Sequence, residues 1–345
     1  MKYSSETGSS MANSQLVARP QSQSGLTLVE LLVAMAISMV IVIAAVSALI
    51  VSRQGFTTVD AASQLRDNAR FATDLIQRLG VQTGYEDVAY AATTRSASAF
   101  GVASNPDPNV TGFNNAVPSS TAPDNTAAAR TTGTVGEGSD ALVLRYQSAE
   151  TFPGSGVADG AMINCAGNPV SGIPQNRDDR STSVLYVDIS SDGEPSLMCS
   201  TGPSTAQPIV RGVENFQVLY GVDGVTPNTA PTAATGAVAV YSVANRYLRA
   251  DQMMVSGDAV GTNANWRRVR SLRIGMVLRG PVGSAQETVS RRLYPLGQAK
   301  ASTTGSAGSA MSSAADVNTA FDTPVDSRLR QTVTFTVHLR NEQGL

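Results

Sequence analysis

The chain has 345 residues, of which 15% are charged, and its 25 basic and 27 acidic side chains give a formal net charge of −2. This near-neutral balance gives no reason to expect a nucleic acid or another polyanion as the main partner. The length is ample for one or two globular units with a sizeable core, although the many small and polar residues predict long loops.

The N-terminal region consists of a polar part followed by an apolar part. Residues 1–24 are polar and slightly cationic, and they lack the apolar stretch that an ordinary secretory signal has before its cleavage site. Residues 26–51 contain a single charged side chain and would form a helix about 39 Å long, enough to cross a bilayer core of about 30 Å. We therefore predict a membrane helix, with the N-terminus in the cytoplasm and the bulk of the chain outside it.

Two residues distinguish this segment from a plain signal anchor. Gly25 marks the junction between the polar and apolar parts, and Glu30 is the one carboxylate in the apolar run. A charged side chain at the centre of a membrane costs roughly 2.5–3.5 kcal/mol on insertion scales, so Glu30 needs a partner or a function. The simpler alternative is that Glu30 only extends toward the membrane surface. The glycine, the apolar run and the carboxylate at this spacing favour a function.

Beyond the membrane segment, an amphipathic helix is predicted to continue to about residue 80. Apolar residues recur at steps of three and four, at Phe56, Val59, Ala62, Leu65, Ala69, Ala72, Ile76 and Leu79. Charged residues occupy the other side, at Arg66, Asp67, Arg70, Asp74 and Arg78. Gly80 is expected to cap the helix, and the apolar stripe is expected to pack on a sheet.

The remainder of the chain is predicted to be rich in strands. Residues 91–138 have little periodicity and are expected to form a loop. Strand-like runs follow at residues 141–146, 184–190, 196–199, 209–220, 237–243, 269–279 and 332–340. The last run is the clearest, because apolar residues alternate with polar ones from Thr332 to Arg340, which predicts a sheet with one face in water.

Cys165 and Cys199 are the only cysteines, and an even pair in an exported chain predicts one disulfide bond. The chain has a single histidine, His338, and no CxxC spacing, so neither a metal site nor a cofactor site is expected. His338 falls on the polar face of its strand, and no nucleophile motif accompanies it. We therefore predict no catalytic residues.

Other polar clusters have ordinary structural interpretations. Asp178 and Asp179 lie in the turn-like segment PQNRDD, where a solvated loop is expected. The glycines from Gly133 to Gly138 do not precede a helix, as a phosphate-binding loop would require, and they predict turns. The one basic concentration comprises Arg267, Arg268, Arg270, Arg273 and Arg279. Because side chains alternate between the two faces of a strand, Arg273 and Arg279 are expected on a solvated face. The interleaved aromatic residues typical of single-strand nucleic acid binding are missing, apart from Trp266.

The sequence Gly25-Leu26-Thr27-Leu28-Val29-Glu30 resembles the class III signal of type IV prepilins. In that family a prepilin peptidase cuts after the glycine and the new N-terminus is methylated, which implies cleavage between Gly25 and Leu26 and methylation of Leu26. Leu26 departs from the usual Phe. Glu30 becomes the fifth mature residue, whose carboxylate would be the counter-charge for the N-terminal ammonium of an adjoining subunit during assembly.

Three further blocks resemble those of the PilW family of minor pilins. They are IVRGVENFQVLYGVD (209–223), WRRVRSLRIGMVLR (266–279) and HLRN (338–341). The resemblance implies an α+β, type IV pilin-like fold, in which a long N-terminal helix packs on an antiparallel β-sheet with long loop insertions. It also implies four parts, namely a removed leader (1–25), a transmembrane and assembly helix (26–51), an amphipathic continuation (52–80) and a periplasmic body (81–345).

The resemblance further implies a minor pilin at or near the pilus tip that primes assembly, with twitching motility, adhesion and DNA uptake as associated functions. Its expected partners are other minor pilins, the major pilin, the prepilin peptidase, inner-membrane lipid and the assembly platform. The protein would be a single-pass inner-membrane protein before it enters the pilus fibre. Two alternatives stay open, a GspJ-like pseudopilin of type II secretion and a signal-anchored periplasmic enzyme or adhesin.

Overall fold

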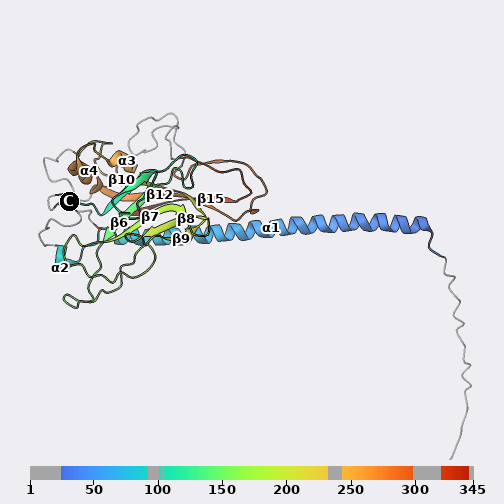
Figure 1. Cartoon of the computed structure of the whole chain (residues 1–345), viewed down its shortest axis with the longest axis horizontal. Coiled ribbons are helices and arrows are strands. Elements are labelled where there is room, and N and C mark those ends of the chain that lie inside the picture. The colour runs from blue at the N-terminus through green and yellow to red at the C-terminus, as the bar shows by residue number, and fades with distance from the viewer. Residues whose placement is uncertain (1–24, 92–100, 103–104, 232–242, 298–319, 342–345) are drawn as a thin grey trace, which may run out of the picture. The chain divides into compact units, whose positions relative to one another are not determined.

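A computed structural model describes residues 25–91, 101–102, 105–231, 243–297 and 320–341. The chain divides into two compact units, Met1–Arg53 and Gln54–Leu345, and each is described by itself. Helix α1 (Leu28–Gln82) begins in the first unit and ends in the second. In the second unit, which we call the body, the strands gather around the C-terminal part of α1 (Figure 1). The predicted leader, residues 1–24, lies outside the described residues.

Helix α1 continues past Gly80, so the prediction that this glycine caps the helix is wrong. The residue with the left-handed backbone that typically follows a helix is Gly84, with φ of 76°. Gly80 instead allows close packing, because a β-carbon there would collide with the side chain of Val337. The sequence alone does not separate these two uses of glycine.

The predicted buried stripe of α1 is largely confirmed. Leu65, Ala69, Ala72, Ile76 and Leu79 are buried in the body, and the charged residues of the opposite side are exposed. The prediction fails at the first turns, because Phe56 and Val59 are 73% and 70% exposed. Ala61 is the first buried residue of the helix. The apolar surface that the body leaves uncovered therefore extends beyond the membrane-length segment.

The body contains two main antiparallel sheets. The first has the strand order β3-β6-β7-β8-β9. Its strands are β3 (Val110–Phe113), β6 (Ala141–Tyr146), β7 (Ser181–Ile189), β8 (Pro195–Ser200) and β9 (Gln207–Arg211). The second has the order β11-β10-β12-β15. Its strands are β10 (Val213–Val222), β11 (Arg246–Leu248), β12 (Val269–Arg279) and β15 (Arg330–His338).

The body also contains short strand pairs and short helices outside the two main sheets. Three two-stranded pairs are formed by β1 (Gly101–Val102) with β2 (Asn105–Pro106), β4 (Ala116–Pro118) with β5 (Ala127–Ala129), and β13 (Arg292–Leu293) with β14 (Phe321–Asp322). The short helices are α2 (Val88–Ala91), α3 (Ala250–Met253) and α4 (Ala259–Trp266). The connection from β6 to β7 carries only isolated bridges, which agrees with the predicted long loops.

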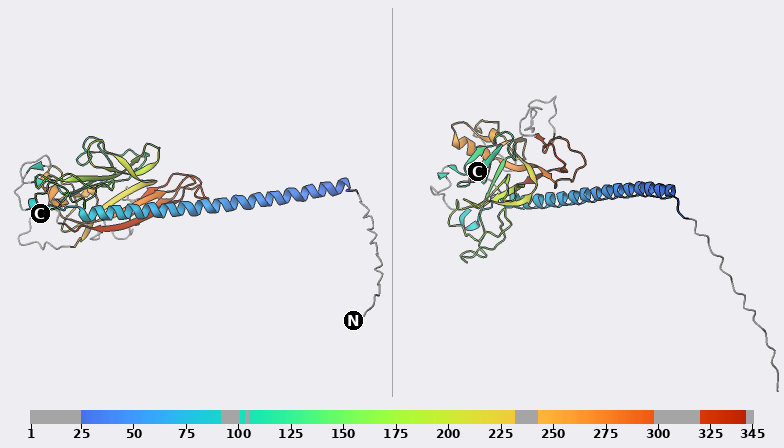
Figure 2. Two further views of the ribbon diagram at one scale, coloured as in Figure 1. Left: turned by 90° about the horizontal axis from the view of Figure 1, so that it is seen from below. Right: turned by 45° about the vertical axis from the view of Figure 1, so that its right-hand side comes forward.

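One hydrophobic core joins both sheets and α1. It includes Leu65 to Leu79 of the helix, Leu142 and Leu185 of the first sheet, and Phe216 and Ile274 of the second. The helix also touches the terminal strand of each sheet, since Gly80 packs against Val337 of β15 and Asn68 Nδ2 donates to the Arg211 carbonyl of β9 at 3.5 Å. Figure 2 shows β15, in red, beside the C-terminal part of α1. The predicted α+β class, a long helix on antiparallel sheet, is thus confirmed.

The strand predictions have mixed outcomes. The runs at 141–146 and 269–279 coincide with β6 and β12, and those at 184–190, 196–199 and 332–340 overlap β7, β8 and β15. The run at 209–220 was wrongly joined, because Gly212, with φ of 78°, separates β9 from β10 and the two strands belong to different sheets. The predicted loop at 91–138 contains β3, β4 and β5. Residues 237–242, which make up nearly all of the run predicted at 237–243, lie outside the described residues.

Candidate functional site

The N-terminal end of α1 is built as a reciprocal cap. Gly25, Leu26 and Thr27 precede the helix, and Glu30 lies in its first turn. The Thr27 hydroxyl accepts from the Glu30 N–H at 3.3 Å, and the Glu30 carboxylate accepts from the Thr27 N–H at 3.1 Å. Thr27 Oγ1 also lies 3.2 Å from Glu30 Oε2. Two backbone donors that a helix start leaves unpaired are thereby satisfied.

This capping box was not part of the sequence prediction, although the pattern Thr-x-x-Glu before an apolar run is its recognised signal. It places the Glu30 carboxylate close to the backbone where the predicted cleavage would create an amine. Gly25 is exposed and a β-carbon there would meet no atom within 4 Å, so the peptide bond between Gly25 and Leu26 lies in open space.

The helix that follows the cap is apolar on all sides and uncovered. All residues from Gly25 to Thr57 are exposed, and α1 includes a stretch that is long and apolar enough to cross a membrane. A helix in water usually has one apolar stripe, whereas one that is apolar all round is buried in a large core or in a membrane. The chemistry that this segment offers is therefore contact with lipid or with the apolar surfaces of other chains.

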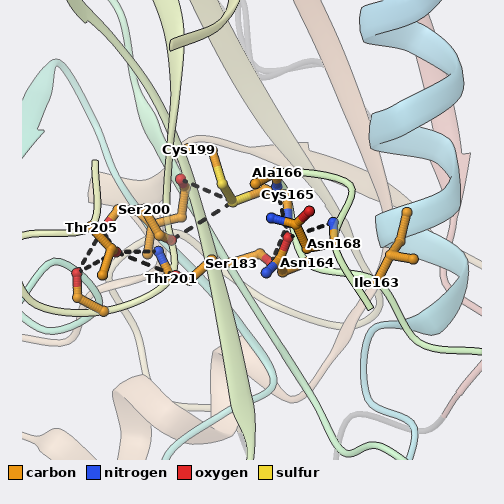
Figure 3. The surroundings of a disulfide bond; sticks show 12 residues. Ile163, Asn164, Cys165, Ala166, Asn168, Ser183, Cys199, Ser200, Thr201 and Thr205 are labelled. Carbon is orange, nitrogen blue, oxygen red and sulfur yellow. Dashed lines mark hydrogen bonds between the residues drawn. A yellow bond between two sulfur atoms is a disulfide. The ribbon is translucent and has the colours of Figure 1, made fainter. Parts of the chain in front are cut away.

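The structure contains the predicted disulfide bond. Cys165 and Cys199 are bonded, with their α-carbons 5.5 Å apart, and both are fully buried (Figure 3). The bond ties the connection between β6 and β7 to strand β8, and the Cys165 N–H donates to Ser183 Oγ of β7 at 3.0 Å. Nearby, Gln82 of α1 bonds to both backbone groups of Ile163. The disulfide thus holds a long loop against the end of the helix.

The remaining candidate residues do not gather into a reactive site. His338 is exposed on β15, as predicted. Asp178 and Asp179 lie in or beside a turn, as predicted, but Asp178 is only 3% exposed, so that loop is not fully solvated. Gly133, Gly136 and Gly138 have φ values of 81°, 75° and 77°, in agreement with the predicted turns. Among the described residues, no three His, Cys, Asp or Glu side chains are grouped as a metal site requires.

The predicted solvation of the arginines on β12 is wrong for Arg279. Its side chain is 16% exposed and pairs with Glu194 at 2.8 Å and with Glu214 at 3.1 Å. Arg330 pairs with Glu214 at 2.6 Å and with Asp326 at 2.7 Å. Arg328 extends the network to Glu194 at 3.3 Å. This ionic network connects the hairpin between β7 and β8 with β10, β12 and β15.

The pKa values of two acids in the network reflect these contacts. Hydrogen bonds and attraction from Arg279 and Arg328 outweigh partial burial and lower the pKa of Glu194, and Arg330 does the same for Asp326. Glu194 and Asp326 are therefore charged at neutral pH. The pairs of Glu194 with Arg279 and Arg328 link the β7–β8 hairpin of the first sheet to the second sheet, whereas Glu214 and Asp326 make their pairs within the second sheet and its preceding loop.

Sequence reasoning also missed the residue that closes the other end of α1. Asn341 Nδ2 donates to the carbonyls of Val81 at 3.2 Å and Thr83 at 3.0 Å. These carbonyls belong to the last turn of a helix, where acceptors lack partners within the helix. Asn341 is the last residue of the block HLRN, and its contact with the end of α1 gives that residue a structural role.

Comparisons with known proteins give matches to two family models. Residues 184–341 match the family model of the type IV pilus-assembly protein W, and residues 20–46 match the model of the prokaryotic N-terminal methylation motif. Among solved structures, the type IV-like pilin TTHA1219 from Thermus thermophilus is 13% identical, with a TM-score of 0.37. That match covers 81% of this chain and 98% of the other. A comparison with curated proteins finds no match.

Proposed function

We propose that the chain, whose residues 184–341 match the PilW family model and whose residues 20–46 match the N-terminal methylation motif, acts as a type IV minor pilin. A prepilin peptidase cuts between Gly25 and Leu26, the new amine of Leu26 is methylated, and residues 26–51 hold the subunit in the inner membrane. The body lies in the periplasm until the subunit enters the fibre at or near its tip and primes assembly with other minor pilins. In this role the protein is a structural subunit and not an enzyme.

The observation that carries this proposal is the uncovered N-terminal helix. Its apolar side chains are exposed on every side from Leu26 to Val59, including Phe56 and Val59 beyond the membrane-length segment. Lipid covers such a surface in the membrane, and only other apolar helices can cover it once the subunit has left the membrane. A fibre of pilin-like subunits, with other minor pilins and the major pilin as neighbours, provides that cover.

Glu30 directs the assembly step in this proposal. An unpaired carboxylate inside the membrane is costly. The Leu26 ammonium of an adjoining subunit has the opposite charge and can pair with it. The Thr27 cap satisfies Glu30 in the isolated subunit, so assembly exchanges an internal partner for one on the neighbour. A subunit that accepts an ammonium in this way lies beneath another pilin and not at the extreme tip.

The first test is the mass of the mature N-terminus in cells that make pili. The expected product begins at a methylated Leu26, and recovery of the chain from membranes with residues 1–25 still attached would overturn the proposal. Loss of piliation or twitching in a deletion strain supports the pilus role, whereas loss of protein secretion with normal pili would assign the chain to type II secretion.

The second test separates charge from capping at Glu30. Glu30→Gln keeps an amide that can fill the capping box but removes the charge, whereas Glu30→Ala removes both. A charge-assisted contact contributes about 1.5–3 kcal/mol, so we expect both variants to reduce incorporation into pili roughly tenfold or more. The body should stay folded, with the disulfide intact. Normal incorporation of both variants would contradict the role of Glu30.

A further inference from the structure

Strand β15 is the terminal strand of the second sheet and is unusually regular. Its nine residues from Arg330 to His338 pair with Arg279 to Ser271 of β12 without a register shift. Between its flanking residues it contains the uncharged, largely β-branched sequence QTVTFTV, with no proline. Strands at the edges of sheets expose unpaired backbone groups, and proteins usually protect them with charges, prolines, bulges or short length.

The backbone groups at the free edge of β15 can be identified from its pairing. The Leu339 N–H donates to the Arg270 carbonyl at 3.0 Å, just beyond the strand. Because hydrogen-bonded positions alternate in an antiparallel pair, odd-numbered residues of β15 face β12 and even-numbered ones face outward. The outward residues are Thr332, Thr334, Thr336 and His338, and all four are exposed. Within the described part of the chain, no backbone group pairs with this edge.

The other terminal strands of the two sheets are protected. Strand β11 has three residues and β3 has four. Strand β9 contains Pro208, and its pairing with β8 includes a register shift. Each of these features discourages the addition of another strand. Among the four terminal strands, β15 alone is both long and unbroken.

The apolar face of β15 is also incompletely covered. Val333 and Phe335 are half-buried, although they pack at the margin of the core. Their partners on β12, Met276 and Ile274, are fully buried. The hydrophobic core is therefore partly exposed to solvent at this edge. An added strand with apolar residues at alternate positions would bury Val333 and Phe335 more fully.

We propose that the free edge of β15 accepts an extended segment of another pilin-like subunit, which adds a strand to the sheet. The incoming segment would present apolar side chains next to Val333 and Phe335 and uncharged polar ones next to the threonines. Backbone hydrogen bonds to Thr332, Thr334 and Thr336 would provide affinity, and the alternation would provide specificity. This inference rests on the proposed function and names the kind of contact that a neighbouring subunit makes.

Antiparallel pairing of β15 with the same strand of a second copy is disfavoured by the direction of α1. The start of β15 lies near Thr58, because Ser284 accepts hydrogen bonds from both Thr58 Oγ1 and the Leu329 N–H, at 3.0 Å and 2.8 Å. Its end lies near Gly80, which packs against Val337. β15 therefore runs in the same direction as α1 within the body.

This direction has a consequence for symmetry. A two-fold pair of β15 strands that matches the apolar faces is antiparallel, so the two bodies would point in opposite directions along a contact about 30 Å long. In such a pair the two Gln54 residues, from which each chain leads back to its membrane segment, would lie at opposite ends of the contact. β15 of a second copy is therefore a poor partner, and we assign the incoming strand to a different pilin-like subunit.

The test uses a photo-crosslinking amino acid at position 332 of the full chain in piliated cells, with the same amino acid at Gln207 as the matched control. Gln207 is likewise exposed on a terminal strand, but it precedes Pro208 on the protected β9. We expect an adduct from position 332 with another prepilin-type subunit, mapped by mass spectrometry to an extended segment. Position 207 should give none.

Thr336→Pro removes an outward N–H while leaving every hydrogen bond to β12, and Thr336→Ala changes only the side chain. The proline variant should lower the adduct from position 332 roughly tenfold, and the alanine variant should leave it unchanged. The crosslink does not depend on either substitution, so it tests the proposal even if the proline variant folds poorly.

Three outcomes would overturn the inference: no adduct from position 332, an adduct only within the same chain or with a second copy of it, or an adduct that Thr336→Pro leaves unaffected in a folded protein. Incorporation of the chain into pili is measured in the same cells. A chain that enters pili without the adduct refutes strand addition alone, whereas a chain that never enters pili refutes the proposed function.

Discussion

Gly80 lies where helix α1 packs closely against strand β15. A methyl group there would collide with Val337, and such overpacking typically costs about 1–3 kcal/mol, against a gain of about 1 kcal/mol from the better helix propensity of alanine. We expect Gly80→Ala to lower the free energy of unfolding by up to roughly 2 kcal/mol in denaturant titrations. Adding Val337→Ala should lessen the penalty of the Gly80 substitution.

The matched control for this prediction is Gly55→Ala. Gly55 lies in the same helix, and a β-carbon there meets no atom within 4 Å. The control should therefore raise stability by about 0.5–1 kcal/mol. Equal effects of the two substitutions would show that Gly80 has no packing role.

The buried carboxyl group of Asp140 should make the free energy of unfolding depend on pH in an unusual way. Its carboxylate accepts from the Asn115 N–H at 2.9 Å and from the Val218 N–H at 2.8 Å, which favours the charged form. Complete burial outweighs these bonds and raises the pKa of Asp140 to about 7. The folded state thus holds a proton that the unfolded chain releases near pH 4, so the contribution is full below pH 4 and disappears as the pH rises to 7.

We therefore expect the free energy of unfolding to fall by on the order of 2–3 kcal/mol between pH 5 and pH 8. Asp140→Asn should be less stable overall, because its amide leaves a backbone N–H without an acceptor, but it should lose this slope. Chemical denaturation at the two pH values measures both effects. A wild-type protein equally stable at pH 5 and pH 8 would refute the raised pKa.

At the scale of single residues, the sequence predicted the disulfide bond because Cys165 and Cys199 are the only cysteines of the chain, whereas the role of Glu30 in assembly stays a prediction. It could not predict the role of Asn341, whose partners lie about 260 residues earlier in the chain. It also misjudged Arg279, because charge ordinarily predicts exposure and the acids that allow its burial, Glu194 and Glu214, come from distant strands.

At the scale of elements, the ionic network joins three strands of the second sheet and, through Glu194, reaches the β7–β8 hairpin of the first. Glu214 and Arg330 have side chains only 6% and 7% exposed, and Glu214 is shared by Arg330 and Arg279, which keep Asp326 and Glu194 as partners when the Glu214 charge is removed. We expect Glu214→Gln to cost about 1.5–3 kcal/mol, the contribution of a hydrogen bond to a charged group, measured by thermal or chemical unfolding.

The control is the exposed pair of Glu287 and Arg291, whose side chains are 69% and 65% exposed. Glu287→Gln should change stability by less than about 0.5 kcal/mol, since solvent screens such pairs. A loss below about 1 kcal/mol for Glu214→Gln would mean that the network contributes little to the closure of the sheets.

Elements were predictable where side-chain periodicity was long. The run predicted at 269–279 coincides with β12, and the alternating run at 332–340 finds β15 but is shifted by two residues at each end. The strands β3, β4 and β5 have three or four residues, too few to establish a period. The separation of β9 from β10 depends on the left-handed backbone of Gly212, and glycine allows that conformation without requiring it.

At the scale of the whole chain, the division after Arg53 separates a segment that is apolar and exposed from one that buries its own core. A chain that begins at Gln54 should therefore fold as a soluble monomer with the Cys165–Cys199 bond intact, whereas the full chain should need detergent. Gel filtration, circular dichroism and thiol titration check this prediction. Aggregation of the shortened chain in water would show that the body depends on the preceding helix.

Asn341 makes the completion of α1 depend on a much later part of the chain. The carbonyls that it binds, on Val81 and Thr83, precede it by about 260 residues, so this helix end acquires its donor only after the chain has been made as far as residue 341. A polypeptide interrupted before that residue would lack the donor, and the last turn of its helix would be left to fray.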